Sequence, residues 1–134
     1  MSQENVEIIK GVLEEFIATG QIDRDPLAAD VIWDASTFRG WPDKPVYHGF
    51  DGFSEFVDAW FEPYDDWSVA VDQLLDAGGD RVVAVMRQRA RMRGSDAGVG
   101  LRFGVVYTVE NRKVRRMQLY GTPEEALEAA GLQE

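Results

Sequence analysis

The architecture of the chain follows from residues 81–120, RVVAVMRQRARMRGSDAGVGLRFGVVYTVENRKVRRMQLY, in which long runs rich in β-branched residues alternate with short turns. Such runs predict strands, and turns this short can only join antiparallel neighbours. A further apolar run before this block, ending at the turn 77–80, adds one more strand to the meander. The predicted strands are Trp67–Leu75, Arg81–Arg93, Val99–Glu110 and Lys113–Tyr120.

Helical periodicity dominates the rest of the chain. Apolar residues recur at helical spacing near the N-terminus and again after residue 51, and a capping box with proline at the first helical position opens the C-terminal segment. Helices early and strands late predict one α+β domain over residues 1–134, with helices packed on the concave face of a curved antiparallel sheet. The remaining predicted elements are a helix over Val6–Gly20, a short helix from Asp25-Pro26, a strand over Val31–Phe38, a loop over Gly40–Pro45, a helix over Asp51–Tyr64 and a last helix from Thr122.

Charge is unevenly distributed. Residues 81–116 hold ten of the fourteen Lys and Arg but only two acids, so this block carries +8 while the whole chain carries −10. The net acidity argues against nucleic acid as a partner, since phosphate binding needs a positive footprint. The chain has no cysteine, no long apolar run and no basic leader at its N-terminus. A cytoplasmic protein without disulfides and without a membrane segment is therefore expected.

Three motifs carry a family resemblance. They are Tyr47-His48-Gly49 before the third predicted helix, Gly79-Asp80-Arg81-Val82-Val83 at a strand start, and the ending YGTPEEALEAAGL over 120–132. With the element order, they resemble SnoaL-like proteins of the NTF2-like superfamily, which includes ketosteroid isomerase. The resemblance implies a cone-shaped α+β barrel around a pocket for a small molecule. Because members include enzymes, binding proteins and dimerisation modules, function must be argued from the site.

The catalytic candidates are Asp34, to which the resemblance points, and His48, whose side-chain type can titrate near neutral pH. The resemblance sets Asp34 at the proton-shuttling aspartate of ketosteroid isomerase, where burial in an apolar cavity would raise the pKa of a general base. That family's two oxyanion donors fall near Leu13 and Val105, neither of which can donate a hydrogen bond. The alternative for Asp34 is an ion-paired residue at a strand end. His48 is the only histidine, and its alternative role is to bond backbone groups beside Gly49.

Arg87 and Arg89 are candidate ligand-binding residues whose direction the sequence leaves open. Arginines alternate with Gln88 and the small or apolar residues of the same strand, so the two sets occupy opposite faces. Hydrophobicity alone places the arginines outside. The resemblance places Arg87 and Arg89 in the cavity and leaves an apolar convex face, which a homodimer would cover.

Aromatic residues complete the predicted pocket. Trp60 belongs to an aromatic stripe on the third predicted helix, which would either roof a cavity or serve as ordinary core. The resemblance turns Phe103 and Tyr107 inward, and Tyr107 would then offer a hydroxyl in an apolar pocket. Tyr120, just before the last helix, would do likewise, and a structural hydrogen bond is the alternative for both tyrosines.

These observations leave three hypotheses for function. The first is an isomerase, cyclase, dehydratase or hydrolase without a cofactor, acting on a small hydrophobic molecule with Asp34 as base. The second is a non-catalytic binder of a small ligand, such as an anion, held by Arg87 and Arg89. The third is a dimeric structural module. With one histidine and no cysteine, no metal site is expected.

Overall fold

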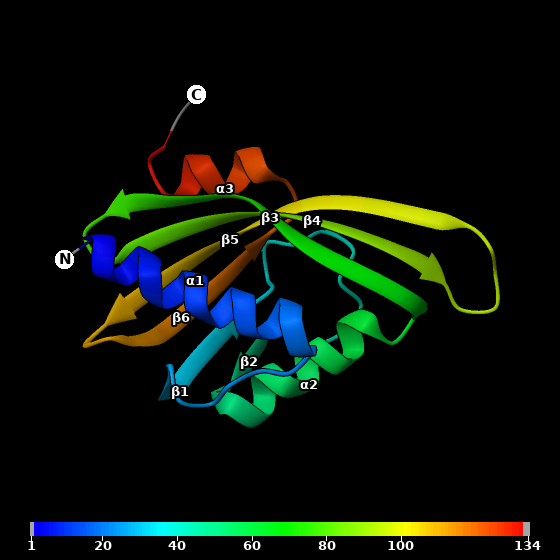
Figure 1. Cartoon of the computed structure of the whole chain (residues 1–134), viewed down its shortest axis with the longest axis horizontal. Coiled ribbons are helices and arrows are strands. Elements are labelled where there is room, and N and C mark those ends of the chain that lie inside the picture. Colours follow the sequence, from blue (N-terminus) through cyan, green and yellow to red (C-terminus); the bar gives the residue numbers. More distant parts are fainter. Residues whose placement is uncertain (1, 133–134) are drawn as a thin grey trace.

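The computed structural model describes residues 2–132, which form three helices and six strands (Figure 1). The predicted α+β class is confirmed, and the first and last helices and the four late strands lie within a few residues of their predicted bounds. In chain order the elements are α1 (Ser2–Thr19), β1 (Leu27–Asp34), β2 (Val46–His48), α2 (Gly49–Phe61), β3 (Tyr64–Gly78), β4 (Arg81–Met92), β5 (Gly98–Glu110), β6 (Lys113–Tyr120) and α3 (Pro123–Ala129).

All six strands belong to one curved sheet, in the order β2-β1-β6-β5-β4-β3 (Figure 1). Strands β3 to β6 form the predicted antiparallel meander, whereas β1 lies parallel to β6. The prediction of an entirely antiparallel sheet was therefore wrong at this one pairing. Most of the chain separates β1 from β6, and a connection of that length allows a parallel pair where a tight turn would not.

The segment between α1 and α2 differs most from the prediction. The short helix expected at Asp25-Pro26 does not form, and a strand begins at Leu27 instead. The amide of Val114 donates to the carbonyl of Pro26 at 2.8 Å, so pairing with β6 begins here. Forming the first turn of a short helix costs free energy, and the strand pairing with β6 is the more favourable alternative here. The strand ends at Asp34, short of the predicted Phe38, and the chain returns as β2 to pair with it.

The helices divide between the two faces of the sheet. As predicted, α1 and α2 cover the concave face, where Ile9 and Phe56 join the main core. The last helix, α3, lies on the convex face and packs on Val83 and Val106 through Ala126, Leu127 and Ala130. No described helix is long and apolar enough to cross a lipid bilayer.

Close packing of α3 depends on a glycine beneath it. A Cβ built on Gly104 of β5 would lie 2.4 Å from the Cβ of Ala126, so any larger residue would push the helix away. The helix begins with the predicted cap, because the Thr122 hydroxyl accepts the amide hydrogen of Glu125 at 3.1 Å. Residue 104 therefore fixes the distance between the convex face and its only described helix.

Candidate ligand cavity

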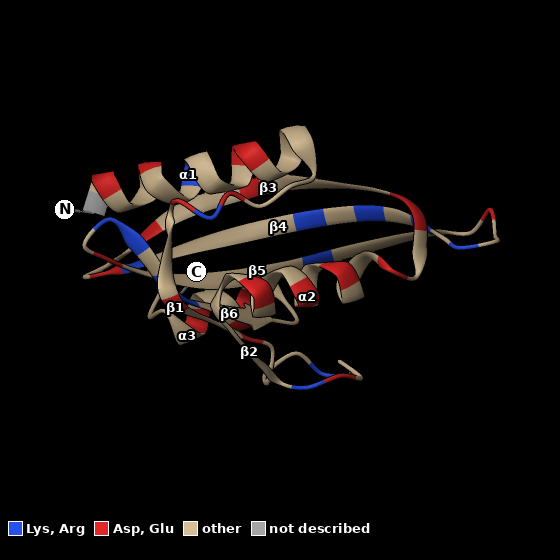
Figure 2. Ribbon diagram, turned by 90° about the horizontal axis from the view of Figure 1, so that it is seen from below, with Lys and Arg blue, Asp and Glu red and all other residues tan. Residues whose placement is uncertain are grey.

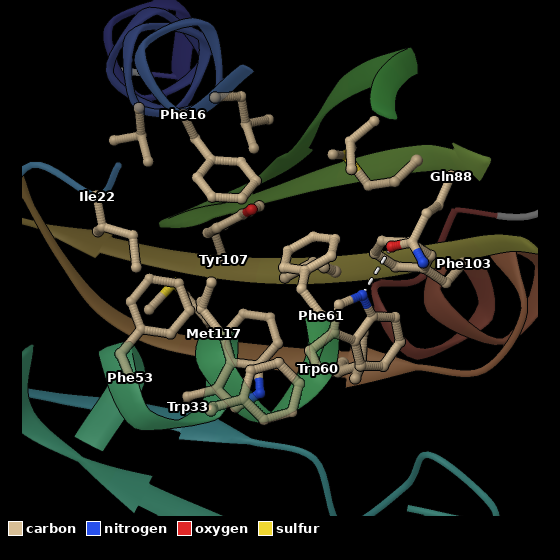
Figure 3. A pocket seen from close by; sticks show the side chains of 18 residues that line it. Phe16, Ile22, Trp33, Phe53, Trp60, Phe61, Gln88, Phe103, Tyr107 and Met117 are labelled. Atoms are coloured by element: carbon tan, nitrogen blue, oxygen red, sulfur yellow. Dashed lines mark hydrogen bonds between the residues drawn. The ribbon is translucent and has the colours of Figure 1, made fainter. Parts of the chain in front are cut away.

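A cavity lies between the concave face of the sheet and the two helices that cover it (Figure 3). Its volume is about 90 Å³. For comparison, an engineered apolar cavity of about 150 Å³ admits benzene, so a ligand of one ring would have to widen this smaller cavity. The lining residues are Val12, Leu13, Phe16, Ile22, Trp33, Phe53, Phe56, Val57, Trp60, Phe61, Val69, Met86, Gln88, Phe103, Val105, Tyr107, Met117 and Leu119.

Aromatic rings form much of the cavity wall. Phe53, Phe56 and Trp60 repeat at helical spacing on α2, which turns all three toward the sheet. The Trp33 ring of β1 stacks on Phe53 with ring centres 4.9 Å apart, and Trp60 meets Phe103 edge-on at 5.5 Å. The structure therefore brings together Trp60 and Phe103, both predicted from sequence as ligand-contacting residues.

A second aromatic group lies where α1, α2 and β3 meet. Phe61 stacks on Trp67 with ring centres 3.8 Å apart, and Phe16 stacks on the same indole at 5.7 Å. Phe16 and Phe61 line the cavity, whereas Trp67 lies outside its lining. All three rings are partly exposed, and only Phe16 and Phe61 of this group belong to the cavity wall.

Trp33 provides the most unusual polar atom of the cavity. Its side chain is 6% exposed, and its indole Nε1 is buried without any hydrogen-bond partner among the described residues. Leaving a buried donor unpaired costs about 1–3 kcal/mol. The ring lines the cavity (Figure 3), but the Nε1 atom itself has almost no accessible surface, so only a ligand that displaced neighbouring side chains would reach this donor. The sequence analysis gave Trp33 no role, since a tryptophan in a strand looks like ordinary core.

Tyr107 adds a second donor from β5. Its side chain is buried and lines the cavity, as the sequence predicted. Burial raises the pKa of the Tyr107 hydroxyl above its usual value, so the group stays neutral and protonated at physiological pH. Within residues 2–132, no hydrogen bond to another protein group engages this hydroxyl, which leaves it available to a bound molecule.

Gln88 supplies a third polar group, at the end of the cavity nearest Trp60. It is 2% exposed, and its Oε1 accepts the Trp60 Nε1 hydrogen at 2.7 Å. An indole nitrogen can only donate, so this bond fixes the amide with its oxygen toward Trp60 and its NH₂ group away from it. The sequence analysis did not single out Gln88. The sequence signal that could have identified Gln88 is its amide side chain among the apolar residues on the cavity-facing side of β4.

Asp34 does not reach the cavity, and the expectation that it projects into the hollow was wrong. Trp33 takes the inward position on β1, and alternation turns the next side chain to the other face. There Asp34 Oδ1 accepts the Ser36 amide hydrogen at 2.8 Å, and Oδ2 pairs with Arg116 Nη2. The carboxylate is only 9% exposed, so it is the ion-paired strand-end residue that the sequence analysis gave as its alternative role.

His48 and Tyr120 also lie outside the cavity lining. His48 is exposed at the N-cap of α2, where its side chain makes no capping hydrogen bond. Tyr120 is partly buried on the face that carries Asp34, and its pKa is raised chiefly by burial and then by the Asp34 charge. The structure thus does not bring Asp34, His48 and Tyr120 together with the cavity residues.

Arg87 and Arg89 are exposed on the convex face, so the cavity-facing direction implied by the resemblance was wrong. Met86 and Gln88 line the cavity instead, which places their neighbours on the opposite side. Hydrophobicity gave the right direction because an unpaired buried guanidinium is very costly. The convex face consequently lacks the apolar character from which a homodimer was inferred.

The described residues offer no evident metal site. Within residues 2–132, no three His, Asp or Glu side chains are grouped closely enough to hold an ion. The only ionisable group in the cavity lining is the Tyr107 hydroxyl. The described lining is therefore apolar apart from the Tyr107 hydroxyl, the Gln88 amide and the Trp33 indole nitrogen, and it includes no carboxylate or imidazole.

A curved sheet with two helices closing its concave face over an apolar chamber is the α+β architecture that the sequence motifs implied. Residues 17–117 match the SnoaL-like domain, and the chain belongs to that family. The resemblance stated from sequence motifs is thereby confirmed. Among curated proteins, none matches the chain.

Solved structures share the fold at low sequence identity. TerC, co-crystallised with polyporic acid, is 19% identical with a TM-score of 0.72, over 96% of this chain and 98% of that chain. An NTF2-like protein from Burkholderia pseudomallei is 18% identical with a TM-score of 0.70, over 93% and 95%. A protein of ketosteroid isomerase-like fold from Catenulispora acidiphila, in complex with trimethylamine, is 13% identical with a TM-score of 0.64, over 90% and 92%.

Proposed function

We propose that the cavity binds a small, uncharged, mostly apolar molecule that carries at least one acceptor oxygen. The observation that carries this proposal is the buried Tyr107 hydroxyl in a lining that is otherwise almost wholly apolar. A carbonyl or ether oxygen placed against that hydroxyl would give it a hydrogen-bond partner, and a ligand that also displaced the side chains around Trp33 Nε1 would satisfy a second donor. The family and the ligand-bound relatives support binding of a small molecule in general.

The chemistry of the lining favours a neutral ligand over an anion or a cation. A carboxylate ligand would lose its hydration without meeting a positive charge, because Arg87 and Arg89 are on the other face of the sheet. An ammonium ligand would likewise find no carboxylate in the lining. A ketone, by contrast, needs only a donor for its oxygen and apolar walls for the rest.

The same lining favours binding over proton-transfer catalysis. A general base must come within hydrogen-bond reach of the proton it removes. Asp34 and His48 lie outside the lining, and Asp34 is already paired with Arg116. Tyr107 and Trp33 can polarise a carbonyl, but within the described lining no group accepts a proton from carbon at neutral pH.

The test compares acetophenone with ethylbenzene, which has nearly the same size and lacks the carbonyl oxygen. Calorimetric titration of the whole protein should show acetophenone binding about tenfold more tightly, the equivalent of one satisfied buried donor. The variants Trp33→Phe and Tyr107→Phe should each reduce that preference while ethylbenzene binding changes little. Trp67→Phe is the matched control, because Trp67 lies outside the lining.

Two results would contradict the proposal. Equal affinity of the wild type for both probes would mean that no donor in the cavity recognises the oxygen. Tighter binding of benzoate than of acetophenone, lost in neither Trp33→Phe nor Tyr107→Phe, would place the ligand elsewhere. If Asp34→Asn abolished acetophenone binding in a folded variant, the exclusion of Asp34 from the site would also be wrong.

A further inference from the structure

Three arginines of the β4–β5 hairpin, Arg87, Arg89 and Arg102, lie outside the cavity lining, and Figure 2 marks the Lys and Arg positions of these strands in blue. Arg87 lies directly opposite Arg102, and Arg89 lies directly opposite Gly100. The three arginines point away from the cavity, since their neighbours Met86, Gln88 and Phe103 line it. Like charges directly opposite one another on a sheet destabilise it, so this arrangement calls for a counter-charge.

The protein supplies only part of that counter-charge. Asp72 of β3 pairs with both arginines of the opposed pair, 3.2 Å from Arg87 Nε and 3.4 Å from Arg102 Nε. Among residues 2–132, Arg89 forms no ion pair. These three guanidinium groups therefore share one paired carboxylate, and Arg91 on the same face of β4 adds a fourth positive charge opposite Asp66 of β3. The side chains of Arg87 and Arg102 remain 45% and 54% exposed, which keeps their free N–H groups open to a solute.

Arg87, Arg89 and Arg102 line a groove of about 460 Å³. Its lining comes from the β4–β5 hairpin alone, over residues 87–90 and 98–102, and no helix contributes to it. Two of these residues, Gly98 and Gly100, have open space where a Cβ would stand, and neither has a positive φ. Their missing side chains leave room beside Arg89 and Arg102, where a larger residue would fill the groove.

We propose that this groove binds a small multivalent anion, a phosphate or a dicarboxylate, between Arg89 and Arg102. Guanidinium groups present paired N–H donors whose spacing matches the oxygens of carboxylates and phosphates. An anion of charge −2 would balance the surplus that Asp72 leaves. A long polyanion such as nucleic acid would instead meet the rest of the chain, which carries −18 outside residues 81–116.

The experiment titrates the whole protein with inorganic phosphate, and separately with succinate, while backbone amide signals are followed by NMR. Saturable shifts at residues 87–90 and 98–102 are expected with at least one of the two anions. Arg89→Gln should weaken that binding about tenfold, as for the loss of one charge-assisted hydrogen-bond pair. Arg115→Gln is the matched control, because Arg115 already pairs with Asp30 and Glu110.

A gain-of-charge variant tests the same site without removing an arginine. Gly100→Asp places a carboxylate opposite Arg89 in open space, and it should compete with the added anion and abolish the shifts. Phosphate binding without succinate binding would identify phosphate as the ligand class, and the reverse result would identify the dicarboxylate.

Three outcomes would overturn the proposal. These are no saturable shift with either anion, equal weakening by Arg89→Gln and Arg115→Gln, or undiminished shifts in Gly100→Asp. The cavity proposal does not depend on this result, since acetophenone binding should be the same in Arg89→Gln and in the wild type.

Discussion

The two faces of β4 hold different chemistry within a single strand. The inward set, Val82, Ala84, Met86 and Gln88, is almost fully buried and meets the cavity or its surrounding core. On the outward set, Val83 and Val85 are buried, whereas Arg87 and Arg89 are exposed. The difference shows that one strand can bound an apolar chamber on one side and an arginine groove on the other, because alternation keeps the two apart.

The strongest way to break this comparison is to exchange the chemistry of adjacent positions. Met86 is 4% exposed, so Met86→Arg buries a charge with no partner and should lower the free energy of unfolding by about 3–5 kcal/mol. Arg87→Met removes only a partly exposed ion pair with Asp72 and should cost less than about 1 kcal/mol. Urea denaturation of both variants measures the difference. Similar losses would mean that the assignment of the two faces is wrong.

A substitution at Asp34 should have an intermediate effect on the free energy of unfolding, and it tests whether this residue lies on the face away from the cavity. Asp34→Asn keeps an oxygen for the Ser36 amide but weakens the pairing with Arg116, whose side chain is 41% exposed. The expected loss is about 1–2 kcal/mol in the free energy of unfolding, since the bond involves two charged groups. Acetophenone affinity should stay unchanged. A variant of normal stability that no longer binds the ketone would make Asp34 a cavity residue after all.

The smallest expected effect is a pH dependence of stability, and it tests whether the Tyr107 hydroxyl in the cavity is shielded from water. Burial raises the pKa of Tyr107 above its ordinary 10.0, so above that pH the unfolded chain gives up this proton while the native protein retains it. The associated stability is fully present below pH 10 and falls as pH rises further, by about 1 kcal/mol over the first unit. Tyr107→Phe should flatten that fall. Urea denaturation at pH 8 and pH 11 measures it, and an unchanged slope would show that the hydroxyl is hydrated.

Most of the fold could be predicted from the sequence, because the long strands and the helix caps have local sequence signals. Strand β6 has its predicted bounds, Lys113–Tyr120, and the cap at Thr122 forms as expected. The errors lie where a non-local partner decides. Strand β1 forms after Pro26 because β6 pairs with it, and no property of the local sequence reveals that partner.

The candidate site was harder to predict because it depends on which alternate residues of each strand face the cavity. A shift of one residue exchanges the faces, and the resemblance assigned the wrong phase to Asp34 and to Arg87. Trp60 was placed correctly because it continues an amphipathic helical pattern, and Phe103 and Tyr107 because the resemblance turned their side of β5 inward. Trp33 and Gln88 were missed because an unpaired indole and a fixed amide become visible only when the surrounding contacts are known.

The parallel pairing of β1 with β6 has a consequence for how the chain folds. The contact between Asp34 and Arg116 spans 82 residues, so β1 has no neighbour on that side until the last strand has formed. Closing so long a loop is entropically unfavourable, and folds rich in such contacts fold slowly. During synthesis, the aromatic side chains of α2 and β1 therefore remain exposed to solvent until the C-terminal third of the chain has been made. In that interval chaperones can bind them, and they can drive aggregation.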